Sequence, residues 1–405
     1  MAVCVMTMHE IPEVILKAGR EKSLRRRHPW IFSGAIEKVS GQPPAGSTVR
    51  VVAQSREFLA YAACSPSSQI RLRAWSFDES STVDSAFIES RIAVSIELRR
   101  KLGVLNPDGA CRLIFSESDG LPGLIVDRYG EYLVCQFLSA GAEFWRDAIV
   151  TALQEQLSPL AIMERSEAGV RRKEGLEPRR GTLRGTVPSA PIEFVSDNFR
   201  QLVDLEQGQK TGSYLDQSNN RLRVAAYASG GRVLDAYSYS GAFSIKALLQ
   251  GATDAMLIDS SADALSLARK QADLNGVAER CHYVNAGVPE ELRRLRDTQE
   301  QFDLVVLDPP KFVSSQQQLK SGCRGYKDIN MLGMQLLKPG GVLATFSCSG
   351  HMSADLFQKV VAGAAVDAGR DAQIIERLTQ APDHPVALPF PEAEYLKGLV
   401  LHVRR

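Results

Sequence analysis

The sequence has no apolar run of the roughly 18 to 20 residues that a membrane-spanning helix needs. Its first residues, Met1 to Glu10, lack the charged start, apolar core and small-residue cleavage site of a secretory signal. We therefore expect a cytoplasmic protein that is not embedded in a membrane. Only 7 cysteines and 6 histidines occur among the 405 residues, and no two cysteines form a CxxC pair. This scarcity predicts neither a structural metal site nor a disulfide framework.

Neither positive nor negative charge is in large excess, since the net charge is only +1. The basic residues are nevertheless gathered in two clusters. They are Lys17, Arg20, Lys22, Arg25, Arg26 and Arg27 in the first, and Arg171, Arg172, Lys173, Arg179, Arg180 and Arg184 in the second. Either cluster alone could be a solvated face. Two of them on an otherwise balanced chain indicate contacts with phosphates.

The first half of the chain predicts two small domains. Short β segments separated by turns predict a β barrel over residues 1–82. They are Val14–Leu16, Thr48–Val52, Leu59–Ala63 and Ile70–Trp75. Residues 83–200 predict an α+β domain. Its elements are a linking helix over about 84–103, strands over Cys111–Ser116, Gly123–Tyr129 and Leu133–Leu138, and a helix over Trp145–Gln156.

Strands and helices alternate strictly over residues 201–405. The expected strands are Val233–Ala236, Ala255–Asp259, His282–Asn285, Leu304–Leu307, Val342–Ser347, Gln373–Arg377 and Gly398–Val403. The expected helices are Ala242–Leu249, Ala262–Asn275, Glu290–Thr298, Ile329–Leu337 and Ala354–Ala368. Such alternation predicts an α/β domain with a doubly wound, mostly parallel, Rossmann-like sheet. Ligands of this fold bind outside the carboxyl ends of the strands.

The turn after the first of these strands carries a single glycine, Gly241, close to Asp235. A lone glycine lets a ligand approach the helix N-terminus, but the three-glycine dinucleotide fingerprint is missing, which argues against a nicotinamide cofactor. Asp259 ends the second strand, where a carboxylate can accept hydrogen bonds from two ribose hydroxyls. The pattern indicates a nucleoside ligand, although Asp259 could instead be a helix-capping residue.

The fourth strand ends in Asp308-Pro309-Pro310-Lys311-Phe312. Two prolines cannot donate hydrogen bonds to a strand ladder, so the strand stops and the chain is held stiffly. An acid followed by two prolines at this point is how nucleobase and RNA methyltransferases frame a planar base beside the methyl donor. The alternative is a turn without a function.

The fifth strand ends in Ser347-Cys348-Ser349-Gly350, which places a thiol at the polar exit of an apolar run. Carbon 5 of a pyrimidine is too weak a nucleophile to take a methyl group from a sulfonium. Addition of a thiolate at carbon 6 activates carbon 5, and Asp308 can assist by proton transfer to the base. The alternative is that Cys348 only packs in the core.

The motifs of the whole chain together resemble the 23S rRNA (cytosine-C5)-methyltransferases that carry an N-terminal PUA domain. They are Arg26–Phe32, Asp119–Asp127, Lys210–Gln217, Asp308–Phe312, Cys323–Asp328 and Phe346–Gly350. The resemblance implies S-adenosyl-L-methionine as cofactor and 23S rRNA as partner, with cytosine 1962 as the target. It also implies a PUA-like RNA-binding barrel, an RNA-binding middle domain and a methyltransferase domain.

Individual residues are assigned through the same resemblance. The implied catalytic residues are Cys348 and Asp308. The implied cofactor-binding residues are Lys210, Gly212, Tyr214, Asp216, Asp235, Tyr237, Ser240, Gly241, Asp259, Asn285 and Asp308. The implied RNA-binding residues are Lys17, Arg20, Arg25, Arg26, Arg27, Arg171, Arg172, Arg324 and Lys327.

Three positions depart from the family pattern. Ser218 stands where an arginine is usual, and Asn285 stands where an acid usually meets the adenine amine. Pro310 stands where many other RNA cytosine methyltransferases have a second cysteine that helps product release. Cys323 is a candidate replacement for that cysteine, and the sequence leaves its role open.

Two other functions remain as alternatives at this point. A uracil-C5 RNA methyltransferase would use the same thiol chemistry, and a non-catalytic RNA-binding protein could retain a cofactor fold. The sequence does not reveal the base that removes the hydrogen on carbon 5. It is compatible with a homodimer but does not fix the oligomeric state.

Overall fold

The computed structural model describes residues 11–404 except 168, 197 and 207–211. The chain divides into two compact units, and both are discontinuous in sequence. The first unit comprises Met1–Ala190, Asp204–Ser213 and Asp383–Ala393, and the second comprises Pro191–Val203, Tyr214–Pro382 and Glu394–Arg405. The predicted domain boundaries after residues 82 and 200 stay predictions. Within the described ranges, no helix has the length and apolar character required to cross a membrane.

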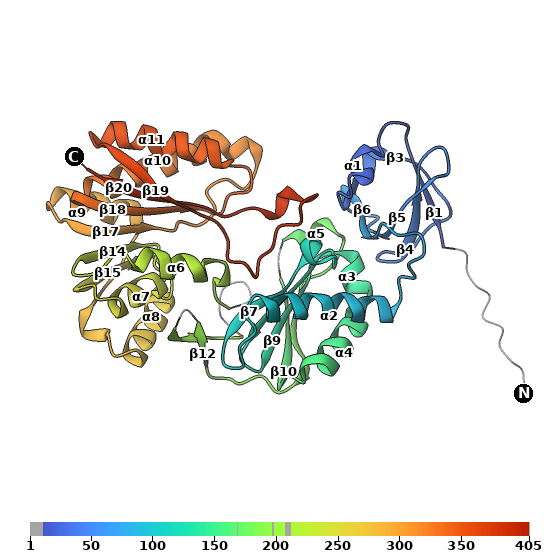
Figure 1. Ribbon diagram of the computed structural model, residues 1–405, viewed down its shortest axis with the longest axis horizontal. Helices are drawn as coiled ribbons and strands as arrows, with labels where there is room; N and C mark the ends of the chain where they lie inside the picture. Colours follow the sequence, from blue (N-terminus) through green and yellow to red (C-terminus); the bar gives the residue numbers. More distant parts are fainter. Residues whose placement is uncertain (1–10, 168, 197, 207–211, 405) are drawn as a thin grey trace, which may run out of the picture. The chain divides into compact units, whose positions relative to one another are not determined.

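The first unit begins with a six-stranded sheet whose order is β2-β6-β5-β4-β1-β3 (Figure 1). Its elements are β1 (Glu13–Leu16), α1 (Lys22–Arg25), β2 (Trp30–Phe32), β3 (Ile36–Val39), β4 (Thr48–Val52), β5 (Phe58–Cys64) and β6 (Ile70–Ser76). The four strands predicted from the sequence are present, and β2 and β3 were missed. Side chains such as Val14, Val49, Val51 and Leu72 alternate along the strands and fill the core.

A five-stranded sheet with the order β11-β10-β9-β8-β7 follows in the same unit. The elements are α2 (Ser85–Lys101), β7 (Ala110–Phe115), β8 (Leu124–Tyr129), β9 (Tyr132–Phe137), α3 (Ala140–Phe144), α4 (Arg146–Leu157), β10 (Ala161–Ser166), α5 (Val170–Lys173) and β11 (Arg179–Gly185). The carboxylate of Asp84 caps α2 by accepting a hydrogen bond from the backbone nitrogen of Phe87 at 2.9 Å. Ile88 and Ile92 of α2 pack into the core over the sheet.

Arg99 of α2 is fully buried in this unit. Its guanidinium donates to both carboxylate oxygens of Asp119, at 2.6 and 2.8 Å, and to the backbone carbonyl of Asp383, at 2.8 Å. The carboxylate of Asp383 in turn accepts a hydrogen bond from the backbone nitrogen of Arg112 at 2.8 Å. These bonds fasten residues 383–393, which come near the end of the chain, into a unit made mostly of its first half.

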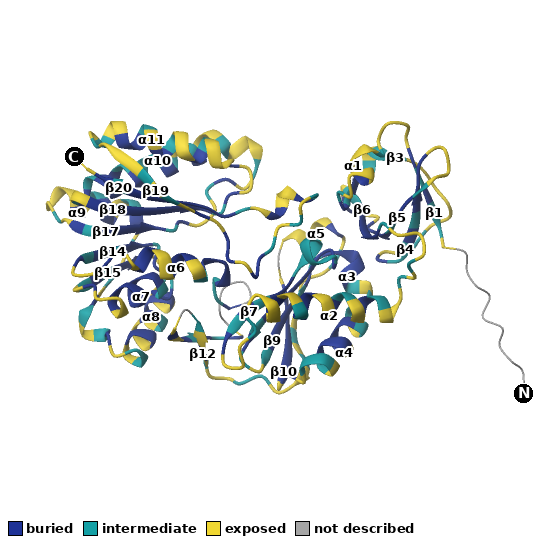
Figure 2. Cartoon of the chain, viewed as in Figure 1, coloured by how far each residue is buried: buried dark blue, intermediate teal, exposed yellow. Residues whose placement is uncertain are grey.

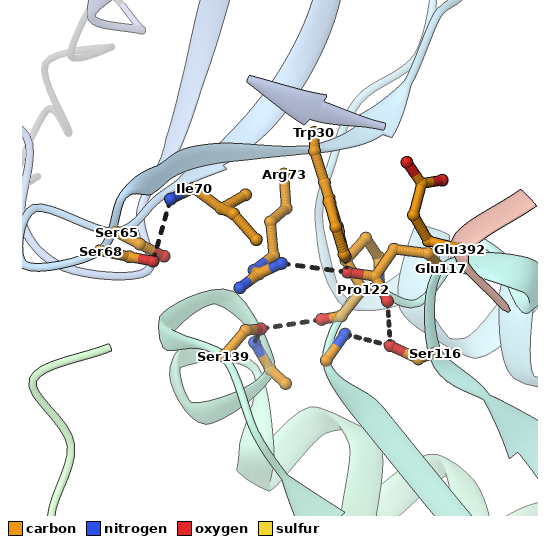
Figure 3. A network of polar contacts seen from close by, with 12 residues as sticks. Trp30, Ser65, Ser68, Ile70, Arg73, Ser116, Glu117, Pro122, Ser139 and Glu392 are labelled. Atoms are coloured by element: carbon orange, nitrogen blue, oxygen red, sulfur yellow. Dashed lines mark hydrogen bonds and ion pairs between the residues drawn. The ribbon is translucent and has the colours of Figure 1, made fainter. Parts of the chain in front are cut away.

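A buried ion cluster connects the six-stranded barrel with the five-stranded domain inside the first unit (Figure 3). Arg73 of β6 donates to Glu117 at 3.2 Å and to Glu174 at 2.8 Å. The indole nitrogen of Trp30 donates to Glu117 at 2.7 Å, and the Ser65 hydroxyl donates to Glu174 at 2.7 Å. The side chains of Arg73, Glu117 and Glu174 are all nearly buried, and Arg73 forms an ion pair with each glutamate. The two negative charges therefore depend on Arg73 for neutralisation.

Removal of this buried charge should cost much of the stability of the first unit. We expect Arg73→Met to lower the free energy of unfolding by about 3 to 5 kcal/mol, because two buried carboxylates lose their partner. Urea denaturation followed by tryptophan fluorescence measures the change. Arg100→Ala, which removes an exposed ion pair with Glu97 on α2, is the control and should leave the midpoint unchanged. Equal midpoints for both variants would contradict the prediction.

The second unit is built on a seven-stranded sheet with the order β16-β15-β14-β17-β18-β20-β19. The strands are β14 (Arg232–Ala236), β15 (Asp254–Asp259), β16 (Cys281–Asn285), β17 (Phe302–Leu307), β18 (Leu337–Ser347), β19 (Ala372–Leu378) and β20 (Lys397–Val403). Neighbouring strands from β16 to β18 are parallel, and β20 is antiparallel to both β18 and β19. The central strands are almost wholly buried (Figure 2).

Helices cover both faces of this sheet, as a doubly wound fold requires. They are α6 (Ser218–Ala225), α7 (Ala242–Leu249) and α8 (Ala262–Leu274) over one face, and α9 (Val288–Asp297), α10 (Leu319–Gln335) and α11 (Ala354–Ala368) over the other (Figure 1). A separate hairpin of β12 (Ile192–Ser196) and β13 (Phe199–Val203) precedes the sheet. The predicted α/β fold class is confirmed.

The main correction concerns α10, which was predicted over Ile329–Leu337. The helix begins ten residues earlier, at Leu319, and Leu337 already belongs to β18. The polar residues of its first half hid the helix, because they lie on its exposed side. Gly322 and Tyr326 face the protein interior from the same turns.

Candidate functional site

The turn between β14 and α7 has a strained backbone. Tyr237, Tyr239 and Gly241 have φ angles of 66°, 47° and 75°. Positive φ is uncommon for residues other than glycine, and such residues gather at ligand-binding sites, where the surrounding structure maintains the strain. This turn lies at the carboxyl end of the first strand of the parallel sheet, where ligands of the fold bind.

Gly241 has a second reason to be glycine besides its φ. A Cβ atom at this position would lie 2.7 Å from a methyl group of Leu257 and 3.2 Å from Cβ of Ala268. The missing side chain therefore gives room to β15 and α8, and the sequence-based explanation that it gives room to a ligand stays a prediction. Its positive φ also sets the shape of the turn.

Asp235 is buried at the end of β14. Its Oδ2 accepts hydrogen bonds from the Ser244 hydroxyl at 2.8 Å and from the Ser244 backbone nitrogen at 3.2 Å. Burial raises the pKa of Asp235 to about 7, against the effect of the Ser244 bonds, and the charge of Asp259 adds to the rise. Among the residues that the structure describes, Asp235 Oδ1, the Tyr237 hydroxyl and the Ser238 hydroxyl are buried without a hydrogen-bond partner. Buried polar atoms of this kind fit a polar ligand that carries donors or positive charge.

Asp259 and Asn285 end the two neighbouring strands and are partners in the β15–β16 register. The Asp259 carboxylate accepts hydrogen bonds from the backbone nitrogens of Tyr239 at 2.9 Å and Ser261 at 2.8 Å. Asn285 Nδ2 donates to the Asp259 carbonyl at 3.0 Å. This bond identifies the amide nitrogen, so Asn285 Oδ1 is the atom that can accept from an adenine amine.

A segment before α6 approaches Asp308. Gln217 Nε2 donates to Asp308 Oδ2 at 3.0 Å, and the Tyr395 hydroxyl donates to Asp216 Oδ2 at 2.5 Å. The ring of Tyr214 meets the ring of Tyr239 edge to face, with 5.3 Å between centroids. The structure therefore brings together three of the predicted cofactor residues, Tyr214, Asp216 and Asp308, with Tyr395, which the sequence analysis missed.

Two other residues were predicted in the same segment. Lys210 lies outside the described residues. Gly212 is buried, has a φ of 139° and belongs to the first unit. Ser240 is buried in the β14–α7 turn, and its carbonyl accepts from Gln271 Nε2 at 2.5 Å.

Asp308 and Cys348 follow the carboxyl ends of adjacent parallel strands. β17 pairs with β18 so that Leu307 lies opposite Thr345, and both strands continue toward the same edge of the sheet. Burial raises the pKa of the Tyr214 phenol, and the charges of Asp308 and Cys348 contribute to the rise. The strand register thus brings the two predicted catalytic groups to the same edge of the sheet.

A buried polar cluster holds the segment around Cys348. The Ser347 hydroxyl donates to the Tyr326 hydroxyl at 2.9 Å, and the Tyr326 and Ser349 hydroxyls share a hydrogen bond of 3.0 Å. The Ser349 hydroxyl also accepts from the backbone nitrogen of Val313 at 3.2 Å. The cluster joins the end of β18 to α10 and to the loop that carries Asp308.

Cys323 lies on α10 and packs partly into the core beneath it. It lines a surface hollow of about 580 Å³ with Leu356 and Val360 of α11 and with the basic residues Arg324 and Lys327. Lys327 also forms an ion pair of 2.7 Å with Asp367. Burial raises the pKa of the Cys323 thiol.

The N-terminal basic cluster surrounds a hollow of about 530 Å³ in the barrel. Arg20, Lys22 and Arg26 line it together with Trp30 and Phe32. The other three basic residues of the cluster are not part of this lining: Lys17 donates to the Gly34 carbonyl at 3.1 Å, Arg25 pairs with Glu57 at 2.5 Å, and Arg27 lines an adjoining hollow with His28 and Leu388. Cations beside aromatic rings are typical of surfaces that bind single-stranded RNA.

Arg171 requires a correction. It is 1% exposed, and its guanidinium donates to Glu143 at 2.8 Å, to the Glu177 carbonyl at 2.7 Å and to the Phe137 carbonyl. A guanidinium bonded in this way is part of the interior of the domain, so Arg171 is removed from the predicted RNA-binding residues. Arg172 is exposed. Over the part of the chain that the structure describes, no group of three or more His, Cys, Asp or Glu side chains could hold a metal ion.

Comparison with known families identifies the class of the protein. Residues 14–77 match a PUA-like domain family, and residues 183–401 match the S-adenosylmethionine-dependent methyltransferase family. The chain is thus a methyltransferase that uses S-adenosylmethionine and carries a PUA-like domain.

Full-length relatives narrow the class further. The ribosomal RNA large subunit methyltransferase I of Klebsiella pneumoniae (strain 342) is 48% identical over 399 residues, which cover 98% of this chain and 100% of the relative. The protein of the same name from Aeromonas salmonicida (strain A449) is 50% identical, over 96% of this chain and 99% of the relative. The chain belongs to the ribosomal RNA large subunit methyltransferase I family, which confirms the predicted resemblance.

Solved structures share the fold at lower identity. A candidate S-adenosylmethionine-dependent methyltransferase from Streptococcus mutans has a TM-score of 0.82 at 19% identity and covers 96% of this chain and 99% of its own. A methyltransferase solved in complex with SAH has a TM-score of 0.84 at 19% identity.

Proposed function

We propose that this protein methylates carbon 5 of one cytidine in 23S rRNA in the cytoplasm, with Cys348 as covalent nucleophile. Its relatives are named for methylation of large-subunit rRNA, which supports the substrate class. The observation that carries the finer proposal is the pair formed by a carboxyl group and a thiol, Asp308 and Cys348, at the carboxyl ends of adjacent parallel strands. A thiol is superfluous for methylation of a nitrogen or a hydroxyl but necessary for carbon 5.

The chemistry follows from these two groups. The Cys348 thiolate forms a bond with carbon 6, and Asp308 gives a proton to the ring nitrogen, so that the carbon 5–carbon 6 electrons become nucleophilic. S-adenosylmethionine, when bound, supplies the methyl group as an electrophile. A base then removes the hydrogen on carbon 5, the double bond re-forms as the thiolate leaves, and the ring nitrogen returns its proton to Asp308. Gln217 fixes the Asp308 carboxyl through its hydrogen bond to Oδ2.

The residues around the β14–α7 turn fit the methyl donor. The orphaned Oδ1 of Asp235 can accept from its ammonium group, Asp259 from its ribose hydroxyls, and Asn285 Oδ1 from its adenine amine. The remaining proposed contacts are Lys210, Gly212, Tyr214, Asp216, Tyr237, Ser240, Gly241 and Asp308. Calorimetry that finds equal S-adenosylmethionine affinity in Asp259→Ala and the unaltered protein would contradict the assignment of Asp259.

Tritium release distinguishes this function from its nearest alternative. Carbon 5 of the target loses its hydrogen in the reaction, so rRNA labelled with tritium at carbon 5 of cytosine should release label to water. The same RNA labelled at carbon 5 of uracil should release none. Release from uracil alone would identify a uracil-C5 methyltransferase, and no methyl transfer to any rRNA would identify a binding protein.

We propose that the hollow lined by Arg20 and Arg26 contacts the rRNA backbone, together with Lys17, Lys22, Arg25, Arg27, Arg172, Arg324 and Lys327. Arg20→Ala combined with Arg26→Ala should weaken RNA binding and lower the salt slope of log affinity by about 0.7 to 0.9 per lost phosphate contact. Filter binding at several salt concentrations measures both. Arg100→Ala, on α2, is the matched control, and an unchanged slope in the double variant would show that the two arginines are merely solvated.

A further inference from the structure

Lys397, the first residue of β20, lies beside the end of β18 that carries Cys348. It pairs with Ser347 in the antiparallel register. Its side chain is directed inward: the residue is 9% exposed, and Nζ donates to the backbone carbonyl of Ser349 at 2.9 Å. Cys348 thus stands between the register partner of Lys397 and its hydrogen-bond acceptor.

A buried ammonium group needs a negative partner, because transfer of a charge out of water costs several kcal/mol when nothing neutralises it. One carbonyl dipole does not neutralise a full charge. Within the described residues Lys397 makes no ion pair with a carboxylate, although many other cations of the chain do. The buried ammonium group of Lys397 therefore has no carboxylate counter-ion among the described residues.

The charged and titratable groups around Lys397 come from several elements. Burial lowers the pKa of Lys397. The nearby groups Cys348 and Glu394 oppose this decrease, and Lys311 adds to it. Of the two groups that can be negative, Cys348 is the one whose neighbour in the chain, Ser349, accepts the hydrogen bond from Lys397. The phenols of Tyr214 and Tyr326 are also near Cys348. Burial raises the pKa of both phenols, so they stay neutral near pH 7.

We propose that Lys397 is a positioning residue that keeps Cys348 in the thiolate form and, through the Ser349 carbonyl, holds the segment that carries it. The inference rests on the proposed function, in which the thiolate attacks carbon 6. A cation beside a thiol stabilises the thiolate, and the thiolate satisfies the buried cation. The same charge favours departure of the thiolate when the carbon 5–carbon 6 double bond re-forms.

Alkylation by iodoacetamide tests the proposal without any methyl transfer. The full-length protein is alkylated at a series of pH values, and peptide mass spectrometry gives separate rates for Cys348 and Cys323. An ordinary thiol titrates near pH 8.5. We expect the Cys348 rate to be half-maximal clearly below this pH. Cys323 serves as internal control and should titrate above it, because burial raises its pKa.

Two variants separate charge from hydrogen bonding. Lys397→Gln retains a donor for the Ser349 carbonyl but removes the charge, and it should shift the Cys348 midpoint upward by about one pH unit, a tenfold slower alkylation at pH 6.5. Lys397→Arg should restore most of the rate. The Cys323 profile should be the same in all three proteins, which a general loosening of the fold would not allow.

Two results would overturn the proposal. One is a Cys348 midpoint at or above pH 8.5 in the unaltered protein, a result that stands even if Lys397→Gln fails to fold. The other is an unshifted midpoint in folded Lys397→Gln. Neither outcome depends on turnover, so both are distinguishable from failure of the proposed function, which methyl transfer by Cys348→Ala would show.

Discussion

Cys348→Ala should abolish methyl transfer while S-adenosylmethionine and RNA still bind. The lost step is formation of a covalent bond, and no binding interaction is removed, so kcat should fall below detection with little change in either affinity. Single-turnover transfer of labelled methyl groups measures the first quantity, and calorimetry and filter binding measure the other two. Robust turnover by this variant would overturn the mechanism and the main reason for assigning carbon 5.

RNA that carries 5-fluorocytidine at the target gives the same prediction a positive readout. Fluorine cannot leave as a cation, so elimination stalls after methylation and the adduct persists. The unaltered protein should be trapped as a complex stable on a denaturing gel, and Cys348→Ala should not. Cys64→Ala, which truncates a buried cysteine of the barrel, is the control and should be trapped like the unaltered protein.

Cys323→Ala is informative in the same assay. If Cys323 assists product release, its loss should let a covalent complex accumulate on ordinary cytidine. Cys323 lies on α10 and lines a hollow together with the apolar residues Leu356 and Val360, which favours a packing role. We therefore expect no accumulation with this variant.

Asp308→Asn should lower kcat by about 10² to 10⁴, the range typical of a lost general acid. Asparagine has the same shape and can still accept the hydrogen bond from Gln217, so the fold of the loop should persist. Because the group is removed from proton transfer, KM for RNA should change far less than kcat. Single-turnover rates with saturating cofactor make the comparison.

Asp303→Asn is the matched control for that experiment. Asp303 lies in β17 near its amino-terminal end, whereas Asp308 follows the strand's carboxyl end; Asp303 accepts from Lys338 at 2.8 Å and from the Arg232 backbone nitrogen at 2.8 Å. Its substitution should affect stability and leave kcat unchanged. Equal losses of kcat in both variants would mean that Asp308 acts on stability alone.

The sequence was most informative where hydrophobic periodicity and capping agree. The bounds of α7 and α11 were predicted as observed, because apolar spacing, a glycine before α7 and Ser353 before α11 mark them. β10 was missed for the opposite reason. It is wholly buried, yet half of its residues, Glu164, Arg165 and Ser166, are polar, and their partners come from distant parts of the chain.

The site shows the same division. The positions of Asp308 and Cys348 just after two strand ends were predictable, because the end of an apolar run can be read from the sequence alone. Lys397, Tyr326 and Tyr395 were not, since a lysine at the start of a strand and tyrosines in a helix or loop resemble surface residues. Only the β18–β20 register and the hydrogen bonds to Ser349 and Asp216 reveal their place.

The discontinuity of the first unit has a consequence for biogenesis. A ribosome synthesises the barrel and the five-stranded sheet early. Asp383, whose carbonyl accepts a hydrogen bond from the buried Arg99, is added only when most of the second unit has been synthesised. Until residues 383–393 are synthesised, the nascent first unit lacks the hydrogen bonds that Asp383 makes with the Arg99 guanidinium and with the backbone nitrogen of Arg112. A gene fragment that stops before residue 383 would encode a product that lacks this closing contact, so expression of the N-terminal half alone should yield a more protease-sensitive fold.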